Sequence, residues 1–272
     1  MSDCVRRAAP ALAFLALIAS FCALPARAAE VVTLATRDHV TQSYLLMYDR
    51  AAAPKAVALL FPGGGGEIRL PKDGTLPSYG AAANFLVRSR GLIRDSELAV
   101  ALLDAPSDQQ PGGMRDAFRM GADHATDVAA VLRDLRRRFP GARMVLIGTS
   151  RGTISAAYLG RDLAEPVDAV VLTSTLFLGG RWGSGLSGFD YGKIRAPLLF
   201  VHHRDDGCEF CPYYQAQKLA KTYPLITVRG GKPAQSGPCE PRSAHGYYGK
   251  EAETVAAIKD WIFGRPFARV VE

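Results

Sequence analysis

Short, almost wholly apolar segments recur along most of the chain, and helical stretches separate them. Six such runs of four to six residues share this character: 57–61, 98–103, 144–147, 169–172, 198–201 and 225–228. Strands that are buried on both faces of a parallel sheet have this continuous apolar pattern. The runs therefore predict a mostly parallel sheet whose strands are joined by crossover helices.

Two earlier segments differ from these runs. Residues 31–35 and 41–48 alternate in polarity or are rich in aromatic residues, with Asp38-His39 between them, which predicts an antiparallel hairpin. Five stretches are predicted to be helical: 79–90, 122–139, 153–163, 213–222 and 251–263. The whole pattern indicates an α/β fold with an eight-stranded, mostly parallel, doubly wound sheet. Residues 173–197 contain six glycines and few helix formers, so no large lid domain is expected.

The first 28 residues are typical of a secretory signal peptide. Arg6-Arg7 precede an apolar stretch, residues 11–24, and the small residues Ala26 and Ala28 suit cleavage before Ala29. Residues 29–272 would then form one domain, exported to the periplasm or secreted, with no stable membrane anchor after cleavage.

The chain carries a formal net charge of +7, and removal of the leader would reduce it to +5. The densest basic run, residues 133–138, falls on a predicted helix and is most simply a solvated face. No nucleic-acid-binding motif is present, so no nucleic-acid partner is expected.

The most informative motif follows the run 144–147. Gly148-Thr149-Ser150-Arg151-Gly152 is a G-x-S-x-G pentapeptide between a predicted strand and a predicted helix. A serine hydroxyl is a weak nucleophile unless a sharp turn exposes it beside a base, and glycines on both sides permit such a turn. Ser150 is therefore a candidate nucleophile.

Other chemically useful residues follow three more of the runs. Pro62 and four glycines follow 57–61, the segment His202–Asp206 follows 198–201, and His245 lies in the loop after 225–228. In doubly wound sheets, ligands bind at the carboxyl ends of the strands. A nucleophile, an acid, a base and flexible backbone amides are therefore expected to converge at one edge of the sheet.

At these residues the chain resembles the α/β-hydrolase superfamily, whose members carry a nucleophile, an acid and a histidine in that chain order. The resemblance assigns Ser150 as the nucleophile, Asp206 as the acid and His245 as the base. His203 stands where the family has glycine, so Asp205 stays open as an alternative acid.

The resemblance also implies an oxyanion hole. Arg151 matches the residue whose backbone N–H contributes one donor, and Gly64 or Gly65 matches the second donor on the glycine-rich loop. The resemblance implies no cofactor.

Three cysteines remain after the leader: Cys208, Cys211 and Cys239. Convergence of the acid and base loops would bring Cys208 and Cys239 together, and a disulfide between them would add roughly 3 to 4 kcal/mol, against under about 2 for a Cys208–Cys211 link. We therefore expect a Cys208–Cys239 disulfide and a leftover Cys211. Zinc binding by the cysteines and nearby histidines is a rival, but it would consume His245 or its neighbours, so no metal is expected.

The leading hypothesis is an exported serine hydrolase that cleaves a small or polymeric carboxylic ester, or a related acyl bond, through an acyl-enzyme. Peptidases, thioesterases and lactonases use the same residues. A noncatalytic binding protein that retains the fold is the alternative from a different class.

Overall fold

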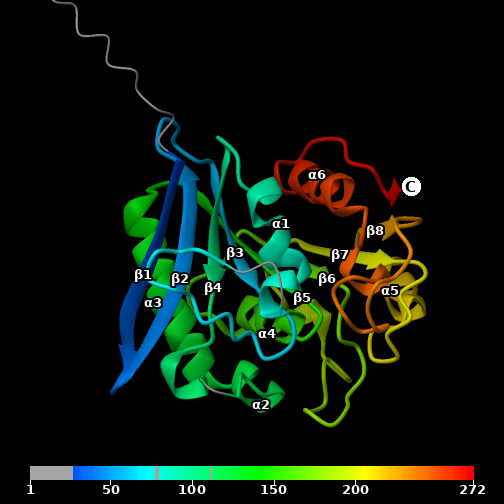
Figure 1. The fold of residues 1–272 in the computed structure, drawn as a ribbon, viewed down its shortest axis with the longest axis horizontal. Helices are drawn as coiled ribbons and strands as arrows, with labels where there is room; N and C mark the ends of the chain where they lie inside the picture. The colour runs from blue at the N-terminus through cyan, green and yellow to red at the C-terminus, as the bar shows by residue number, and fades with distance from the viewer. Residues whose placement is uncertain (1–26, 77–79, 111) are drawn as a thin grey trace, which may run out of the picture.

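One twisted sheet forms the centre of the computed structural model, which describes residues 27–76, 80–110 and 112–272 (Figure 1). Its strands lie in the order β1-β2-β4-β3-β5-β6-β7-β8-β9. The β1–β2 and β2–β4 pairs are antiparallel, and the other neighbouring pairs are parallel. The strands are β1 (Arg27–Arg37), β2 (Val40–Asp49), β3 (Ala56–Phe61), β4 (Leu98–Leu103), β5 (Arg143–Thr149), β6 (Ala169–Thr173), β7 (Leu198–His203), β8 (Leu225–Val228) and β9 (Val270–Val271). The predicted doubly wound architecture is confirmed.

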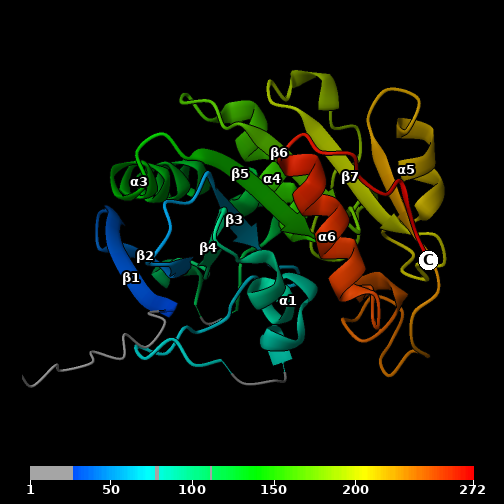
Figure 2. The ribbon, with the colours of Figure 1, turned by 90° about the horizontal axis from the view of Figure 1, so that it is seen from above.

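Helices cover both faces of the sheet, as the view from above shows (Figure 2). One face carries α1 and α6, and the other carries α3, α4 and α5. The helices are α1 (Phe85–Ile93), α2 (Asp116–Arg119), α3 (Ala122–Arg138), α4 (Gly152–Asp162), α5 (Tyr213–Leu219) and α6 (Glu251–Ile262).

The two faces of the sheet bury separate apolar cores. In β3, Val57, Leu59 and Phe61 pack into the core with residues of α3 and α4, whereas Ala58 and Leu60 pack into the core with residues of α1 and α6. This alternation follows from the period of two along a strand, and both sets are apolar because helices cover both faces.

The order of the strands reverses at β3. From β3 the chain moves to β4 on one side, and it then returns to β5 on the other side of β3. The loops that leave the adjacent strands β3 and β5 therefore diverge, which opens a crevice at their carboxyl ends. The glycine-rich loop follows β3, and Ser150 follows β5.

The sheet has one strand more than the eight predicted. The additional strand, β9, has two residues and pairs with β8 near the C-terminus. The first predicted helix begins later than expected, at Phe85, because the Asn84 side chain caps it by accepting a hydrogen bond from the Leu86 amide. The four-residue helix α2 had no counterpart in the sequence prediction.

The predicted signal peptide falls mainly on residues 1–26, which lie outside the described residues. Arg27 and Ala28 already belong to β1, where they pair with Asp49 and Tyr48. Cleavage before Ala29 stays a prediction, and it would shorten β1 by two residues while leaving the rest of the ladder.

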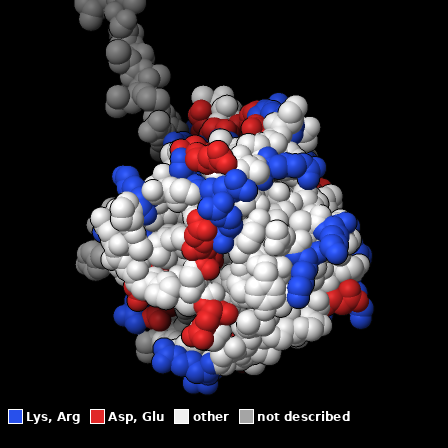
Figure 3. All heavy atoms as spheres, turned by 90° about the vertical axis from the view of Figure 1, so that its right-hand side faces the viewer, with Lys and Arg blue, Asp and Glu red and all other residues white. Residues whose placement is uncertain are grey.

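The segment between β6 and β7 contains no α-helix, only a 3₁₀ turn at Tyr191–Lys193, in agreement with the expected absence of a large lid. None of the helices in the described part of the chain is long and apolar enough to cross a membrane. On the face shown in Figure 3, basic and acidic side chains are interspersed, so this face carries no uniform positive field.

Candidate active site

Ser150 lies on the turn between β5 and α4, in a backbone conformation that serine rarely adopts. Its φ angle is +51°, in the left-handed region. Its amide donates to the carbonyl of Thr173, the last residue of β6, at 3.0 Å. Its carbonyl accepts from the amide of Thr153 in α4 at 2.9 Å, so β6 and α4 both hold the turn. A strained backbone fixed in this way is typical of functional sites.

The glycines of the pentapeptide are required by close packing. A Cβ atom on Gly152 would overlap the carbonyl oxygen of Phe61 on β3, and one on Gly148 would overlap the backbone of Gly152. A Cβ on Gly63, at the start of the glycine-rich loop, would lie 3.0 Å from the Cβ of Ser150. The two loops can therefore approach the serine this closely only because these positions lack side chains.

His245 and Asp206 meet at the same edge of the sheet. His245 lies in a 3₁₀ turn, Ala244–Gly246, and its Nδ1 atom is 3.0 Å from Oδ2 of Asp206 in the loop after β7. Both side chains are nearly inaccessible to solvent, at 6% and 0%. The other carboxylate oxygen of Asp206 accepts from the Cys208 amide at 2.9 Å, which fixes the orientation of the carboxylate. A carboxylate held in this way orients the imidazole and favours the Nδ1–H tautomer.

The alternative acid, Asp205, lies elsewhere. Its side chain is 57% exposed and pairs with Arg204 at 3.1 Å, and this hydrogen bond lowers the pKa of Asp205. His245 therefore faces Asp206 and not Asp205.

His202 and His203, which precede Asp206, both contact backbone atoms. The Nε2 atom of His202 accepts a hydrogen bond from the Thr175 amide at 2.6 Å, and burial lowers the pKa of His202 to about 4. His203 accepts from the Asp205 amide through Nδ1 and lies 2.9 Å from the Gly230 carbonyl through Nε2. These contacts shape the loop that carries Asp206.

Two residues that the sequence prediction missed anchor the His245 loop to the sheet. The buried Tyr247 donates its hydroxyl proton to the Val201 carbonyl at 2.7 Å and accepts from the Ser174 amide at 2.9 Å. The Ser174 hydroxyl donates to the backbone carbonyl of His245 at 2.7 Å. Both residues lie outside the apolar runs and act through hydrogen bonds to residues far away in the sequence, so the hydrophobic pattern could not have revealed them.

The glycine-rich loop presents backbone amides beside Ser150. The Gly63 carbonyl accepts from the Gly66 amide at 3.1 Å, and because a trans peptide directs its C=O and N–H in opposite directions, the Gly64 amide points away from the loop interior. Gly65 instead packs on Gly113: a Cβ added to Gly65 would lie 3.0 Å from the Cα of Gly113. Gly65 is therefore covered by Gly113, whereas the Gly64 amide is directed out of the loop.

Two arginine side chains donate hydrogen bonds to the Gly64 carbonyl. The sequence prediction missed this role of both arginines. The fully buried Arg119 donates to Gly64 O at 3.1 Å and to the Ser155 hydroxyl at 2.8 Å. Arg151 donates to Gly64 O at 3.2 Å and pairs with Asp116 at 2.8 Å. These hydrogen bonds hold the glycine-rich loop beside Ser150.

The structure contains the predicted Cys208–Cys239 disulfide, which links the Asp206 and His245 loops. Cys211 is a free, fully buried thiol, and burial raises the pKa of Cys211 well above its ordinary value, while the adjacent Ser150 hydroxyl acts in the opposite direction.

The ligand atoms of Cys208, Cys211 and His245 lie within 4.8 Å of one another, as in a metal site. With Cys208 oxidised, only the Cys211 thiol and the His245 imidazole of this group could bind an ion.

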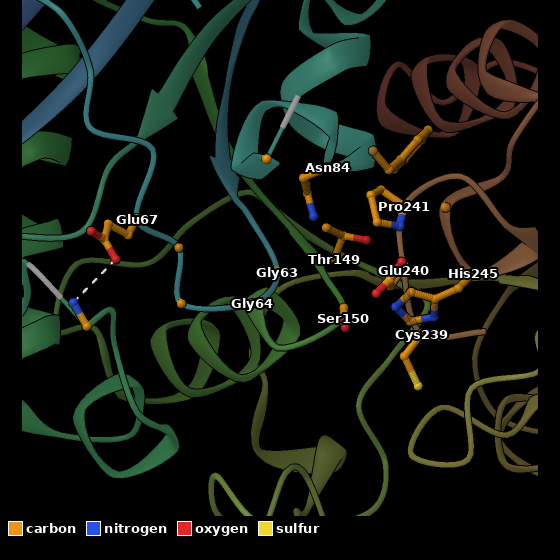
Figure 4. A pocket seen from close by; sticks show the side chains of 16 residues that line it. Gly63, Gly64, Glu67, Asn84, Thr149, Ser150, Cys239, Glu240, Pro241 and His245 are labelled. Carbon is orange, nitrogen blue, oxygen red and sulfur yellow. Dashed lines mark hydrogen bonds between the residues drawn. The ribbon is translucent and has the colours of Figure 1, made fainter. Parts of the chain in front are cut away.

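Ser150 lies between two hollows. The first, of about 360 Å³, is lined by the glycine-rich loop, Asn84, Glu240 and His245. Figure 4 shows the imidazole of His245 directed toward Ser150 across this hollow. The second, of about 430 Å³, lies on the other side of Ser150 and has mainly apolar walls. Ser150 and Gly64 border both hollows, so a reacting group at their junction would extend into each.

No protein-family model matches the chain, and no curated protein matches it either. Solved structures do match it over most of its length. An alpha-beta serine hydrolase homologue from Coxiella burnetii is 15% identical, with a TM-score of 0.56 over 86% of this chain and 95% of its own. A serine hydrolase without a lid from Xanthomonas campestris is 14% identical, with a TM-score of 0.57 over 89% of this chain and 99% of its own. Est1E from Butyrivibrio proteoclasticus is 14% identical, with a TM-score of 0.57 over 86% of this chain and 98% of its own. These similarities show that the chain has the α/β-hydrolase fold.

Proposed function

We propose that the protein is an exported serine hydrolase that cleaves a carboxylic ester or a related acyl bond through Ser150, His245 and Asp206. The observation that carries this proposal is the position of Ser150, on a strained turn at the point where the strand order reverses, in one hollow with a histidine whose Nδ1 lies 3.0 Å from a buried carboxylate.

In the first step, the Nε2 atom of His245 removes the proton from the Ser150 hydroxyl as the oxygen attacks the acyl carbonyl carbon. The negative charge of Asp206 stabilises the imidazolium that forms and holds its orientation. Polar groups that are already held in position need little reorganisation during the reaction. The Cys208 amide holds the Asp206 carboxylate, and the Ser174 hydroxyl holds the backbone of His245.

The carbonyl oxygen becomes negatively charged, and the backbone amides of Arg151 and Gly64 donate to it. One such donor typically contributes about 3 to 4 kcal/mol to the stability of the transition state. The cationic side chains of Arg119 and Arg151 bind the Gly64 carbonyl, which holds the donor loop in place.

The tetrahedral species then collapses. The bond to the leaving-group oxygen breaks, and the His245 imidazolium gives its proton to that oxygen. A water molecule, deprotonated by His245, attacks the acyl-enzyme, and cleavage of the acyl–Ser150 bond returns the proton to the serine and releases the acid. These steps require no cofactor.

Export and substrate type are further parts of the proposal. The basic and apolar leader supports export, as does the disulfide, because disulfides persist in oxidising compartments. Since no α-helix lies between β6 and β7, we infer an accessible site that accepts small or polymeric esters.

Hydrolysis of a panel of 4-nitrophenyl and naphthyl esters of graded acyl length tests the proposal. We expect turnover by the wild type and a loss of at least about 1,000-fold in kcat for Ser150→Ala and for His245→Ala. Ser96→Ala, which changes an exposed serine between α1 and β4 that lines neither hollow, serves as the matched control and should retain activity. Absence of turnover in folded wild-type protein would favour a noncatalytic binding protein. Amide, thioester and lactone substrates of the same acyl groups distinguish the related activities.

A further inference from the structure

His245 is in contact with only one of the two hollows beside Ser150, and this contact indicates which part of the substrate each hollow holds. His245 lines the first hollow but not the second. Under the proposed function, on which this inference rests, His245 must reach the leaving-group oxygen, so the leaving group lies in the first hollow. The acyl group therefore extends into the second.

The second hollow is apolar near the serine. Leu176, Leu178 and Phe210 line it, and the half-exposed Trp182 stands at its edge with 42% of its surface accessible. Such walls favour a chain or ring of carbon atoms next to the reacting carbonyl.

Cationic groups surround the indole at this edge. The guanidinium carbon of Arg181 lies 4.8 Å from the centroid of the Trp182 ring, and those of Arg151 and Arg115 lie 5.5 and 5.9 Å away. An arginine stacked on an aromatic face keeps its N–H edge free for a carboxylate.

Arg181 is the cation of the second hollow that is available for a ligand. The other arginine that lines the hollow, Arg151, is paired with the buried Asp116 at 2.8 Å, so these two charges offset each other. Within the described part of the chain, no carboxylate lies within 4.0 Å of the Arg181 guanidinium.

The first hollow has the opposite character. Glu67 and Glu240 line it, and none of the described residues that line it is a lysine or arginine. Arg69 neutralises Glu67 by a direct ion pair, whereas the exposed Glu240 only accepts a backbone hydrogen bond from Gly237. The cleft is therefore positive on the acyl side and negative on the leaving-group side.

The loop that carries Arg181 and Trp182 is held in place by backbone hydrogen bonds. Gly180 and Gly183 pair with each other, the Leu178 amide donates to the Phe210 carbonyl at 3.0 Å, and the Gly185 amide donates to Asp116 at 3.0 Å. A site fixed before binding loses less entropy when a ligand is bound.

We propose that the second hollow binds an acyl group that is apolar next to the carbonyl and ends in a carboxylate, and that Arg181 binds this carboxylate. The substrate class is the monoesters of dicarboxylic acids, with the free carboxylate distal to the ester.

The test compares esters that differ only in the terminal group. The mono-4-nitrophenyl esters of adipic and suberic acid are the anionic substrates, and 4-nitrophenyl hexanoate and octanoate are their neutral counterparts. Shorter diacid monoesters are avoided because their own carboxylate expels the leaving group. We expect the wild type to favour at least one anionic ester in kcat/KM by about tenfold or more, the factor that a hydrogen bond to a charged group typically contributes.

Arg181→Gln should remove most of this preference, and added salt should weaken it in the wild type because the pair is partly exposed. Arg269→Gln is the matched control, since Arg269 is also exposed and stacked on an aromatic ring, Phe267, at 5.4 Å, but does not line the hollow. It should keep the wild-type preference.

Hydrolysis of the neutral esters without any preference for the anionic ones would overturn the inference alone. A preference that Arg181→Gln leaves intact would also overturn it. Failure of the folded wild type to hydrolyse any of the four esters, with no adduct at Ser150 after treatment with a fluorophosphonate, would overturn the proposed function together with it.

Discussion

The Nδ1 atom of His245 lies 3.0 Å from Oδ2 of Asp206, although 39 positions separate the two residues in the chain. The carboxylate is fully buried and is held by the Cys208 amide, so it cannot rotate freely away from the imidazole. The neighbouring carboxylate, Asp205, is exposed and paired with Arg204.

This pair of adjacent carboxylates offers a direct comparison. Asp206→Asn should lower kcat by about 1,000-fold or more, because an amide in its place stabilises neither the required tautomer nor the imidazolium. Asp205→Asn should stay within about twofold of the wild type, since exposed ion pairs contribute little. Steady-state kinetics on a 4-nitrophenyl ester checks both, and a greater loss in Asp205→Asn would reverse the assignment of the acid.

The turn at Ser150 depends on a glycine at position 152. Gly152→Ala should destabilise the fold by several kcal/mol and abolish activity, because the added methyl group overlaps the Phe61 carbonyl and forces β3 and α4 apart. Gly91→Ala is the control: no atom lies within 4 Å of its added Cβ, and alanine in a helix should stabilise by about 0.5 to 1 kcal/mol. Chemical denaturation measures both changes, and equal stability of the two variants would contradict this explanation.

Arg119 supports the donor loop and is expected to affect both stability and rate. Arg119→Met should lower the free energy of unfolding by about 1 to 3 kcal/mol, since it leaves buried oxygens without a donor, and should lower kcat by about tenfold or more as the Gly64 amide loses its fixed position. Ser155→Ala removes the side-chain hydroxyl that Arg119 binds and should reduce stability with little effect on kcat. Similar kcat losses in both variants would argue against a positioning role for Arg119.

The Cys208–Cys239 disulfide joins the acid and base loops. Replacing both cysteines by serine should lower the free energy of unfolding by roughly 3 to 4 kcal/mol in the chain-entropy model and reduce activity, because both loops gain freedom. Cys211→Ala keeps the disulfide and should destabilise by only about 1 kcal/mol, for the buried sulfur removed. Denaturation and kinetics with and without reductant measure these effects, and a reduced protein as stable and active as the oxidised one would contradict the prediction.

Two buried histidines make stability depend on pH. Burial lowers the pKa of His202 to about 4 and that of His124 to about 3, below the ordinary value of 6.5. The unfolded chain therefore binds these protons at higher pH than the folded chain does. Their contribution to stability is present above pH 6.5 and is lost as the pH falls toward 4 for His202 and toward 3 for His124. At pH 5 each histidine should lower the free energy of unfolding by about 2 kcal/mol relative to pH 7.5.

His202→Gln tests this dependence, since the longer glutamine side chain can place an oxygen near the position of Nε2 and accept from the Thr175 amide but does not titrate. Between pH 7.5 and pH 5, the two histidines together lower the free energy of unfolding, and the variant should lose about half of this decrease. An unchanged decrease would mean that His202 does not control it.

The apolar runs predicted the parallel strands because burial on both faces leaves few polar positions in them. The residues that follow the strands then indicated where Ser150, Asp206 and His245 would lie. The two-residue strand β9 and the four-residue helix α2 were missed, since such short elements have no period of their own. Arg119, Ser174 and Tyr247 were missed for another reason: their importance comes from hydrogen bonds to residues 36 to 73 positions away.

If Ser150 is the nucleophile, a reagent that reacts with activated serines should modify this residue covalently. The folded wild type, treated with a fluorophosphonate, should gain one adduct by intact-mass measurement, and peptide mapping should place it on Ser150. Denatured wild type and folded Ser150→Ala should gain none. An adduct on another residue, or a folded wild type that stays unlabelled, would show that Ser150 is not the nucleophile.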